Sequence, residues 1–417
     1  MMLTTLLSGA LLTATASIPA PVQVPAPGST TDVLAIRIGR AETITQGTLL
    51  HAVVLIEDGK ITAVGEDLPI ERGIPILERP DWVLTPGFVN CHSRLGLDSQ
   101  AGRDFTPDVA AKDELYMTQD IYGDVLEFGV TTLGLYAPGT GIPGTAVAIR
   151  PQGTTAEEAV LIEDAYLKIY MGADANLKKM FRKGWEDLAS YEEKEAKARE
   201  KWEKAIEKKN KKKDEDKAKD DTPDVFVPPD LDPKLARLID LREGRIHALL
   251  QIGKAADFLH VEDLLEEHDF SWVVRAPLRN DIDLFRVADV MGEAEVTVIL
   301  DPEVTLQPNT RRERNIPAEM DRAGARVAFV PLTDNLGGHE NWMRALAQVV
   351  RSGMDRQAAF AAVTLVPAEV LGLGERLGSI DVGKDANLIF WDGDPLEPNT
   401  EIKAVMLEGD VVFGDLD

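Results

Sequence analysis

Short apolar runs, rich in β-branched residues, alternate with polar turns at both ends of the chain. The first part of the chain has three such runs, at residues 33–38, 52–56 and 61–64. A turn containing Asp58-Gly59 joins the last two, and an Asp-Gly pair between two strands is a strong hairpin signal. The last part of the chain repeats the pattern at residues 387–391, 402–407 and 411–413. Both ends are therefore predicted to be β-rich.

The middle of the chain alternates apolar, strand-like runs with helical patterns. The predicted strands are residues 131–136, 248–251, 272–275, 296–300 and 327–331. Helices are predicted at residues 341–352 and 355–364, where apolar residues recur at helical spacing. Strands that alternate with helices indicate a parallel sheet, and the length suits a (β/α)8 barrel. We therefore expect an α/β fold with a TIM-like (β/α)8 barrel over residues 85–378. A small β-sandwich domain is expected from both chain ends, residues 32–84 plus 379–417.

Residues 183–232 differ in kind from the rest of the barrel region. A stripe of apolar side chains at helical spacing runs through dense lysine and glutamate from Trp185 to Ile206. Beyond it, residues 208–221 are almost wholly charged, and several prolines then forbid a continuous helix. We expect an inserted helix followed by a solvated loop. The insertion is also a candidate surface for a partner protein, but a run of charges is more often a solvated face, and we favour that interpretation.

The composition narrows the functional classes. The 417 residues are 44% hydrophobic, enough for one large or two ordinary domains, and the net charge is −26. Such an acidic chain is a poor partner for nucleic acid or for an anionic membrane. The expected partner is a small-molecule ligand or substrate.

The N-terminal segment predicts export. The first thirty residues contain no charged side chain, and an apolar run from Leu3 ends at Ala14-Thr15-Ala16, which resembles a signal-peptide cleavage site. We interpret residues 1–31 as a signal peptide and linker, and expect a secreted or periplasmic protein. The run is shorter than the roughly 20 apolar residues that a membrane span needs, and no other stretch is long and apolar enough. The single cysteine, Cys91, excludes an intrachain disulfide.

Residues 90–94, with the sequence NCHSR, combine several reactive side chains in one predicted strand. Alternate side chains of a strand share a face, so His92 and Arg94 are expected to point one way and Cys91 and Ser93 the other. Two histidines at that spacing would form a metal-binding pair, yet the second is an arginine. The neighbours Cys91 and His92 raise the alternative of a Cys–His dyad, but their opposite faces favour a buried, inert thiol.

The predicted barrel region contains three motifs. They are VLTPGFVNCH at residues 83–92, FGVTT at 128–132, and a segment from TLVPA at 364–368 to LGSIDVGKDANL at 377–388. Together they resemble the amidohydrolase superfamily, specifically its imidazolonepropionase-like branch. The resemblance implies a barrel of the metal-dependent hydrolase type. Its usual reaction is hydrolysis of a non-peptide C–N bond, often in a cyclic amide, by water that one or two divalent ions activate.

The resemblance also implies where metal ligands would lie, at the C-terminal ends of the barrel strands. These positions carry His92, Arg94, Gln251, Gly253, Arg275 and Asp334. Only His92 and Asp334 keep the residue types of the family. Arginine stays protonated and cannot bind zinc, so Arg94, Arg275 and Gln251 are interpreted as metal-replacing or ligand-binding residues. We expect no metal or other cofactor, and the alternative is a single divalent metal such as zinc at His92 and Asp334.

Three functions fit these residues. In a hydrolase with an altered site, His92 would move a proton, Asp334 would orient or accept one, and the two arginines would stabilise an oxyanion. In a binding protein, Arg94 and Arg275 would capture an anionic ligand, and in a structural arrangement they would pair with Asp334. We rank the non-catalytic functions first and expect an exported amidohydrolase-family pseudoenzyme with weak or no activity. His339, in a Gly-rich loop after the last strand, is a further candidate ligand-binding residue.

Overall fold

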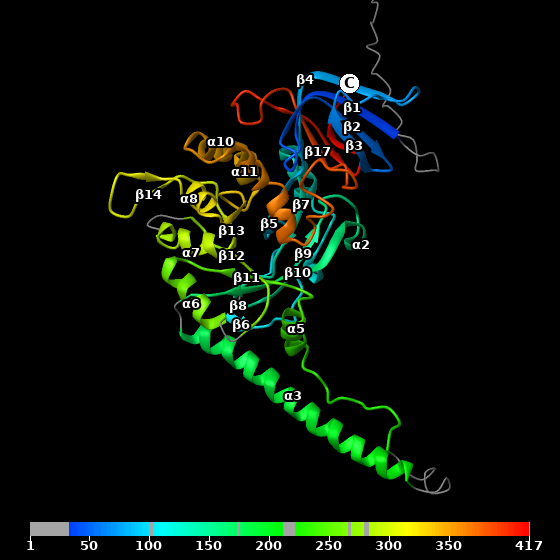
Figure 1. Cartoon of the computed structure of the whole chain (residues 1–417), viewed down its shortest axis with the longest axis vertical. Coiled ribbons are helices and arrows are strands. Elements are labelled where there is room, and N and C mark those ends of the chain that lie inside the picture. Colours follow the sequence, from blue (N-terminus) through cyan, green and yellow to red (C-terminus); the bar gives the residue numbers. More distant parts are fainter. Residues whose placement is uncertain are drawn as a thin grey trace, which may run out of the picture. The chain divides into compact units, whose positions relative to one another are not determined.

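Two large β-sheets organise the chain, one built from both chain ends and one from the middle (Figure 1). The computed structural model describes residues 33–99, 103–172, 175–211, 222–265, 268–278 and 283–416. The predicted signal peptide and linker, residues 1–31, lie outside the described residues. No helix within the described ranges has the length and apolar character that crossing a membrane requires.

The first sheet brings the two ends of the chain together. The N-terminal part supplies β1 (Val33–Glu42), β2 (Thr48–Glu57), β3 (Lys60–Glu66) and β4 (Ile76–Pro86), and the C-terminal part supplies β17 (Leu388–Trp391), β18 (Ile402–Leu407) and β19 (Asp410–Gly414). The strand order is β19-β18-β17-β4-β1-β2-β3, so the ends meet where β17 pairs antiparallel with β4. Asp58 and Gly59 turn the β2–β3 hairpin with positive φ angles of 50° and 76°, as the Asp-Gly pair predicts. All seven strands belong to one sheet, and the β-sandwich arrangement stays a prediction.

The second sheet is a nearly closed barrel of eight strands. They are β5 (Phe88–Ser93), β7 (Val130–Leu135), β9 (Gly144–Ile149), β10 (Val160–Tyr170), β11 (Ala248–Gln251), β12 (Trp272–Arg275), β13 (Thr297–Leu300) and β16 (Arg326–Phe329). Their order is β16-β13-β12-β11-β10-β9-β7-β5. Strand β9 runs antiparallel to both β7 and β10, whereas the other pairs are parallel, so the regular (β/α)8 repeat that we expected is interrupted there.

The gap between the two end strands of the barrel is bridged by irregular backbone. The Phe329 N–H of β16 donates to the Ala362 carbonyl at 2.6 Å, and the Val89 N–H of β5 donates to the Val363 carbonyl at 2.9 Å. Residues 362–363 therefore link β16 to β5 and give both strands a backbone partner.

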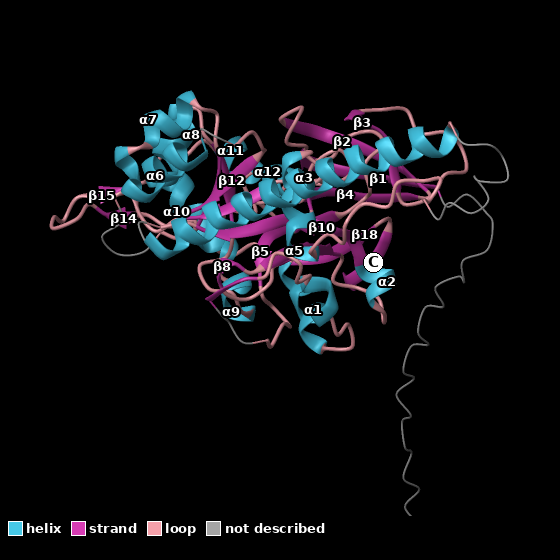
Figure 2. Cartoon of the chain, turned by 90° about the horizontal axis from the view of Figure 1, so that it is seen from below, coloured by secondary structure: helices cyan, strands magenta, loops and turns pink. Residues whose placement is uncertain are grey.

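Helices cover the outside of the barrel. They include α5 (Pro233–Arg242), α6 (Ala255–Leu265), α7 (Ala288–Glu293), α8 (Ile316–Ala323), α10 (Trp342–Arg351), α11 (Arg356–Ala361) and α12 (Leu365–Val370). Figures 1 and 2 both place α6, α7 and α8 beside β12. Shorter elements are α1 (Asp120–Asp124), α2 (Ala156–Ala159), α9 (Leu336–Glu340), and the strand pairs β6 (Arg103–Phe105) with β8 (Thr140–Ile142) and β14 (Thr305–Leu306) with β15 (Glu313–Arg314).

The barrel core follows the alternation of strand side chains. Cys91, Tyr166 and Leu249 are buried in one hydrophobic cluster inside the barrel, while neighbours such as Leu250 and Val298 belong to the cluster shared with the helices. The Cys91 side chain is fully buried, which confirms the expectation of a buried thiol. Burial raises the pKa of this thiol to about 12, so it stays protonated and inert.

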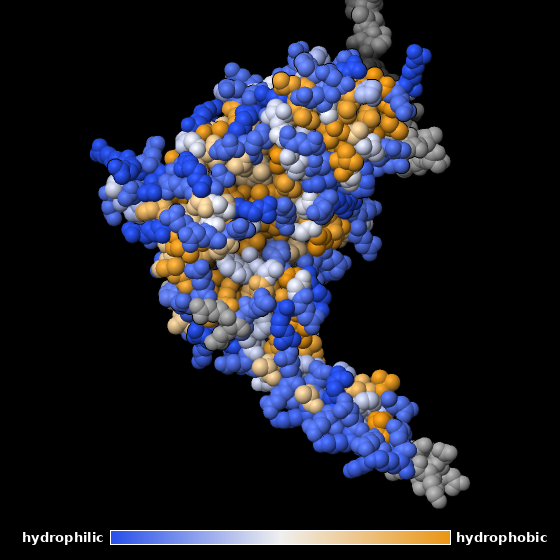
Figure 3. Space-filling model, in the orientation of Figure 1, coloured by the Kyte–Doolittle hydropathy of each residue, from blue (hydrophilic) through white to orange (hydrophobic). Residues whose placement is uncertain are grey.

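The predicted insertion begins earlier than its charge pattern indicates. Helix α3 runs from Ala175 to Asn210, and its first turns bury Phe181 and Leu188 in the barrel core. The helix is therefore partly a core element, which corrects the start predicted at residue 183. Its second half has no buried residue, and hydrophilic side chains cover most of its visible surface in Figure 3. Much of the predicted charged loop, residues 212–221, lies outside the described residues.

Candidate functional site

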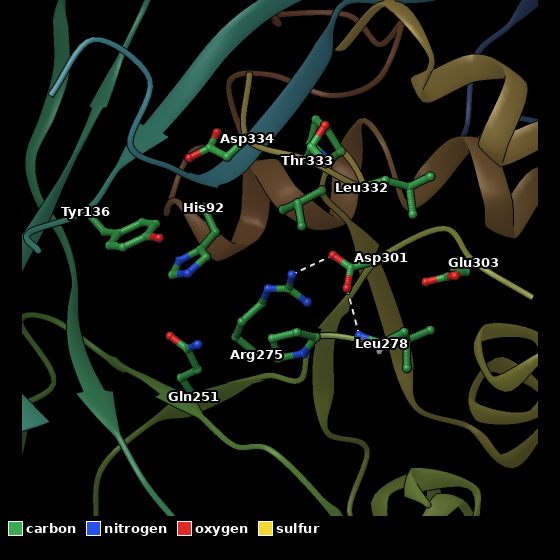
Figure 4. A pocket seen from close by; sticks show the side chains of 13 residues that line it. His92, Tyr136, Gln251, Arg275, Leu278, Asp301, Glu303, Leu332, Thr333 and Asp334 are labelled. Atoms are coloured by element: carbon green, nitrogen blue, oxygen red, sulfur yellow. Dashed lines mark hydrogen bonds and ion pairs between the residues drawn. The ribbon is translucent and has the colours of Figure 1, made fainter. Parts of the chain in front are cut away.

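A cavity of about 690 Å³ lies at the C-terminal ends of the barrel strands. Figure 4 shows side chains from several strand ends pointing into it. Its polar lining consists of His92, Tyr136, Gln251, Arg275, Asp301, Glu303, Thr333 and Asp334. His92 lies on β5, Gln251 and Arg275 end β11 and β12, and the others follow strand ends. Ligands bind at this face in TIM-type barrels, and the cavity contains four of the six predicted site residues.

Asp334 is held by the end of β5. One carboxylate oxygen accepts from the Ser93 hydroxyl at 2.6 Å, and the other accepts from the Arg94 backbone N–H at 2.6 Å. Both oxygens therefore have a strong donor within the protein. The contact fixes the loop after β16 against the strand that carries His92.

The Arg94 side chain is not part of the cavity lining. Its guanidinium donates to the Tyr136 carbonyl at 2.7 Å and to the Ser99 carbonyl at 3.2 Å, and lies 3.7 Å from the Glu114 carboxylate. These contacts therefore give no support to the predictions that Arg94 faces the same way as His92 and replaces a metal. Strand β5 has a register irregularity between Asn90 and Ser93 and ends at Ser93, so simple alternation does not extend to Arg94.

Arg275 does line the cavity, but its partner is a residue that the sequence did not single out. Its guanidinium donates to Asp301 at 2.6 Å and to the Ile299 carbonyl at 3.2 Å, and both members of the ion pair are buried (Figure 4). Asp301 also accepts the Leu278 N–H at 2.7 Å. The expected pairing of Arg275 with Asp334 is thus replaced by a pairing with Asp301. In the sequence, an acidic residue directly after the predicted strand 296–300 was the signal that could have identified Asp301 as a site residue.

His92 is a neutral imidazole that packs against the rings of Tyr136 and Tyr166. The Tyr166 hydroxyl donates to the Cys91 carbonyl at 3.1 Å, so its oxygen accepts from His92 Nδ1–H at 3.0 Å and Nε2 carries the lone pair. Burial, followed by the positive charges of Lys168 and Arg275, holds the pKa of His92 well below its usual value. The imidazole also stacks on Tyr136, with ring centroids 3.9 Å apart and planes 9° apart.

Lys168, on β10, is a second residue that sequence reasoning missed. Its side chain is buried, and its Nζ lies 3.8 Å from the centroid of the Tyr136 ring. An ammonium and a stacked imidazole cannot share one ring face at these distances, so Lys168 and His92 cover opposite faces of Tyr136. Burial, with Arg94 and Arg275 nearby, lowers the pKa of Lys168 to about 7. In the sequence, a charged residue within the otherwise apolar run YLKIY was the signal that could have identified Lys168.

His339 is a structural residue and does not line the cavity at the barrel mouth. The Asn90 amide donates to its Nε2 at 3.1 Å, and its Nδ1–H donates to the Asn335 carbonyl at 2.8 Å. The ring is 2% exposed and both of its nitrogens are engaged. The prediction that His339 binds a ligand at this mouth therefore finds no support in its contacts.

The side chains at the cavity do not fit the divalent metal that the resemblance implies. Across the described ranges, no three His, Cys, Asp or Glu side chains come together in a group that could hold a metal ion. Asp334 already accepts two hydrogen bonds, His92 offers one free nitrogen, and the Arg275 guanidinium nearby repels a cation. No step of a mechanism is therefore assigned to a metal.

Part of the chain is similar in sequence to known amidohydrolases. Residues 306–412 match the amidohydrolase family. The amidohydrolase tasK of Hapsidospora irregularis is 43% identical over 63 residues, which is 15% of this chain and only 6% of that protein. The chain thus spans a small part of the length of the curated relative it matches.

Solved structures share the fold over nearly the whole chain. An amidohydrolase from Thermotoga maritima MSB8 aligns over 92% of this chain and 100% of its own, with a TM-score of 0.72 and 22% identity. The ochratoxinase of A. niger aligns over 93% of this chain and 97% of its own, with a TM-score of 0.51 and 14% identity. These likenesses show the fold.

Proposed function

We propose that this chain is an amidohydrolase-superfamily protein of the imidazolonepropionase-like branch that binds a small polar molecule at the barrel mouth without a resident metal. Hydrolysis is weak or absent in this proposal. The observation that carries it is the internal pairing of the residues that would surround a metal. Asp334 is bound by Ser93 and Arg94 N–H, and Arg275 is bound by Asp301.

The ligand of this proposal is neutral or cationic rather than anionic. Arg94 does not line the cavity, and the charge of Arg275 is offset by Asp301 at 2.6 Å. The described lining contributes two further carboxylates, Glu303 and Asp334. Because a carboxylate lining repels anions, the expected capture of an anionic ligand by Arg94 and Arg275 is not part of this proposal.

A calorimetric titration tests the binding function. The protein, treated with EDTA, is titrated with small cyclic amides such as 2-pyrrolidinone and hydantoin, and binding should be unchanged by the chelator. Gln251→Trp, which fills the cavity, should abolish binding, whereas the exposed change Leu50→Trp should leave it intact. Binding that appears only after zinc is added would contradict the proposal.

One observation favours a second candidate, a metal-independent hydrolase of non-peptide C–N bonds. The lone pair of His92 Nε2 is available at the cavity, because Nδ1 is engaged by Tyr166 and the ring is neutral. Such a nitrogen can accept a proton from water. Turnover of hydantoin that survives EDTA and disappears in His92→Ala would favour this candidate over the binding protein.

A further inference from the structure

Lys168 lies one aromatic ring away from the cavity and has no part in the proposed binding function. It is 4% exposed, and its Nζ contacts the face of Tyr136 opposite to His92. Tyr136 itself lines the cavity. A rotation of this one side chain would therefore bring the Lys168 amine into contact with the cavity contents.

The surroundings of Lys168 favour the neutral amine. The Tyr136 ring stabilises the ammonium form through a cation–π contact. Burial, Arg94 and Arg275 oppose it more strongly, so the pKa falls to about 7. A lysine with an ordinary pKa of about 10.4 has roughly a thousandfold smaller neutral fraction at pH 7. The neutral amine is the nucleophilic form of lysine.

We propose that Lys168 is a reactive amine that captures small aldehydes or ketones from the cavity as an imine, with Tyr136 as the cover that must move aside. The amine nitrogen bonds to the carbonyl carbon. The carbonyl oxygen leaves as water with the two amine hydrogens, and a carbon–nitrogen double bond remains. The carboxylates of the described cavity lining, Asp301, Glu303 and Asp334, repel anions and leave an uncharged carbonyl compound of a few carbon atoms as the expected reactant.

Two other lysines serve as internal controls for this reaction. Lys384 is also buried, but its Nζ donates to the carbonyls of Gly374 and Leu377 at 2.6 and 3.0 Å, which occupy the amine. Lys112 is paired with Glu163, and this hydrogen bond raises its pKa, so its amine stays protonated at pH 7. Neither residue lines the cavity at the barrel mouth.

Reductive trapping tests the proposal on the full chain. The protein is incubated with propionaldehyde and sodium cyanoborohydride at pH 7, and the modified lysines are identified by peptide mass spectrometry over time. Lys168 should be modified at least about tenfold faster than Lys384 or Lys112, with a rate that rises to half its maximum near pH 7. Tyr136→Ala should raise the rate at Lys168 severalfold and leave the two control lysines unchanged.

The same experiment can overturn the proposal. If Lys168 stays unmodified in both the wild type and Tyr136→Ala while exposed lysines react, the amine is not accessible to the cavity and the proposal fails. Modification of Lys168 with the pH profile of the exposed lysines would also contradict it. Neither outcome bears on the metal-free binding function, because hydantoin and 2-pyrrolidinone form no imine.

Discussion

Arg275 and Asp301 form a buried ion pair at the cavity, with 7% and 6% exposure. Arg275→Leu leaves the Asp301 carboxylate buried without its cation, and we expect the free energy of unfolding to fall by about 3–5 kcal/mol. Replacing both residues with leucine should recover most of this loss, because no uncompensated charge remains. Urea unfolding measures the free energy of unfolding of the single and the double variant. The exposed pair Arg37–Glu78 is the control, since Arg37→Leu should cost less than about 1 kcal/mol. Equal losses for Arg275→Leu and Arg37→Leu would contradict the buried pairing.

Lys168 should make stability depend on pH above neutrality. The folded chain releases the Lys168 proton near pH 7, whereas the unfolded chain keeps it up to about pH 10.4. The unfolded state therefore binds more protons in this window, and the contribution of Lys168 to stability rises with pH. Lys168→Met should be more stable than the wild type at pH 7, by roughly 2–4 kcal/mol after the loss of the cation–π contact. The difference between the two proteins should shrink towards pH 10, as followed by urea unfolding. A difference that does not change with pH would show that the Lys168 proton is not released on folding.

Helix α3 combines a core segment with a second half that, among the described residues, has no buried side chain. In the second half, the Trp202 indole donates to the Pro223 carbonyl at 2.8 Å, and its ring lies tilted against Phe226 with centroids 5.8 Å apart, so these contacts are internal to the insertion. Replacing residues 194–228 with a short Gly/Ser linker should change the melting temperature by less than about 2 °C. Phe181→Ala, in the first half, should lower the free energy of unfolding by about 3–5 kcal/mol because its side chain is 1% exposed. A large fall in melting temperature for the linker variant would mean that the distal half supports the barrel.

Elements with a clean local pattern were predictable from the sequence. Strands β11 and β12 have the predicted bounds, and α10 lies within one residue of its predicted range at each end. Strand β10 was missed because Glu163, Asp164 and Lys168 interrupt its apolar pattern. Strand β9 was missed because Gly144 and small alanines dilute its hydrophobicity.

The candidate site was predictable only in part, for a different reason. His92, Gln251, Arg275 and Asp334 do line one cavity, because the strand ends of a barrel converge. The partners of Arg94 and Arg275 were not predicted, since β5 has a register irregularity before Arg94 and Asp301 follows a different strand, β13. Local patterns can mark a charged residue at a strand end, but which side chains pair there depends on three-dimensional packing.

At the scale of the whole molecule, the shared sheet ties the C-terminal strands to the N-terminal ones. Strand β17 pairs with β4, and the Trp391 indole donates to the Thr85 hydroxyl at 3.0 Å. Ending the chain after Leu377 removes β17, β18 and β19 and leaves β4 without its neighbour on one side. We expect this shortened protein to lose cooperative thermal unfolding and to expose apolar surface, measured by calorimetry and dye binding. A cooperative transition at the melting temperature of the full chain would contradict the role of the shared sheet.

The central claim is that internal side-chain contacts occupy the place where the resemblance implies a metal. Metal analysis by mass spectrometry tests it most directly, on the wild type dialysed against zinc, manganese or iron and then freed of loosely bound ions. Asp334 is engaged by Ser93 and Arg94 N–H, and Arg275 is paired with Asp301, so we predict a metal content far below one ion per chain for each metal. One tightly held ion per chain would contradict the account.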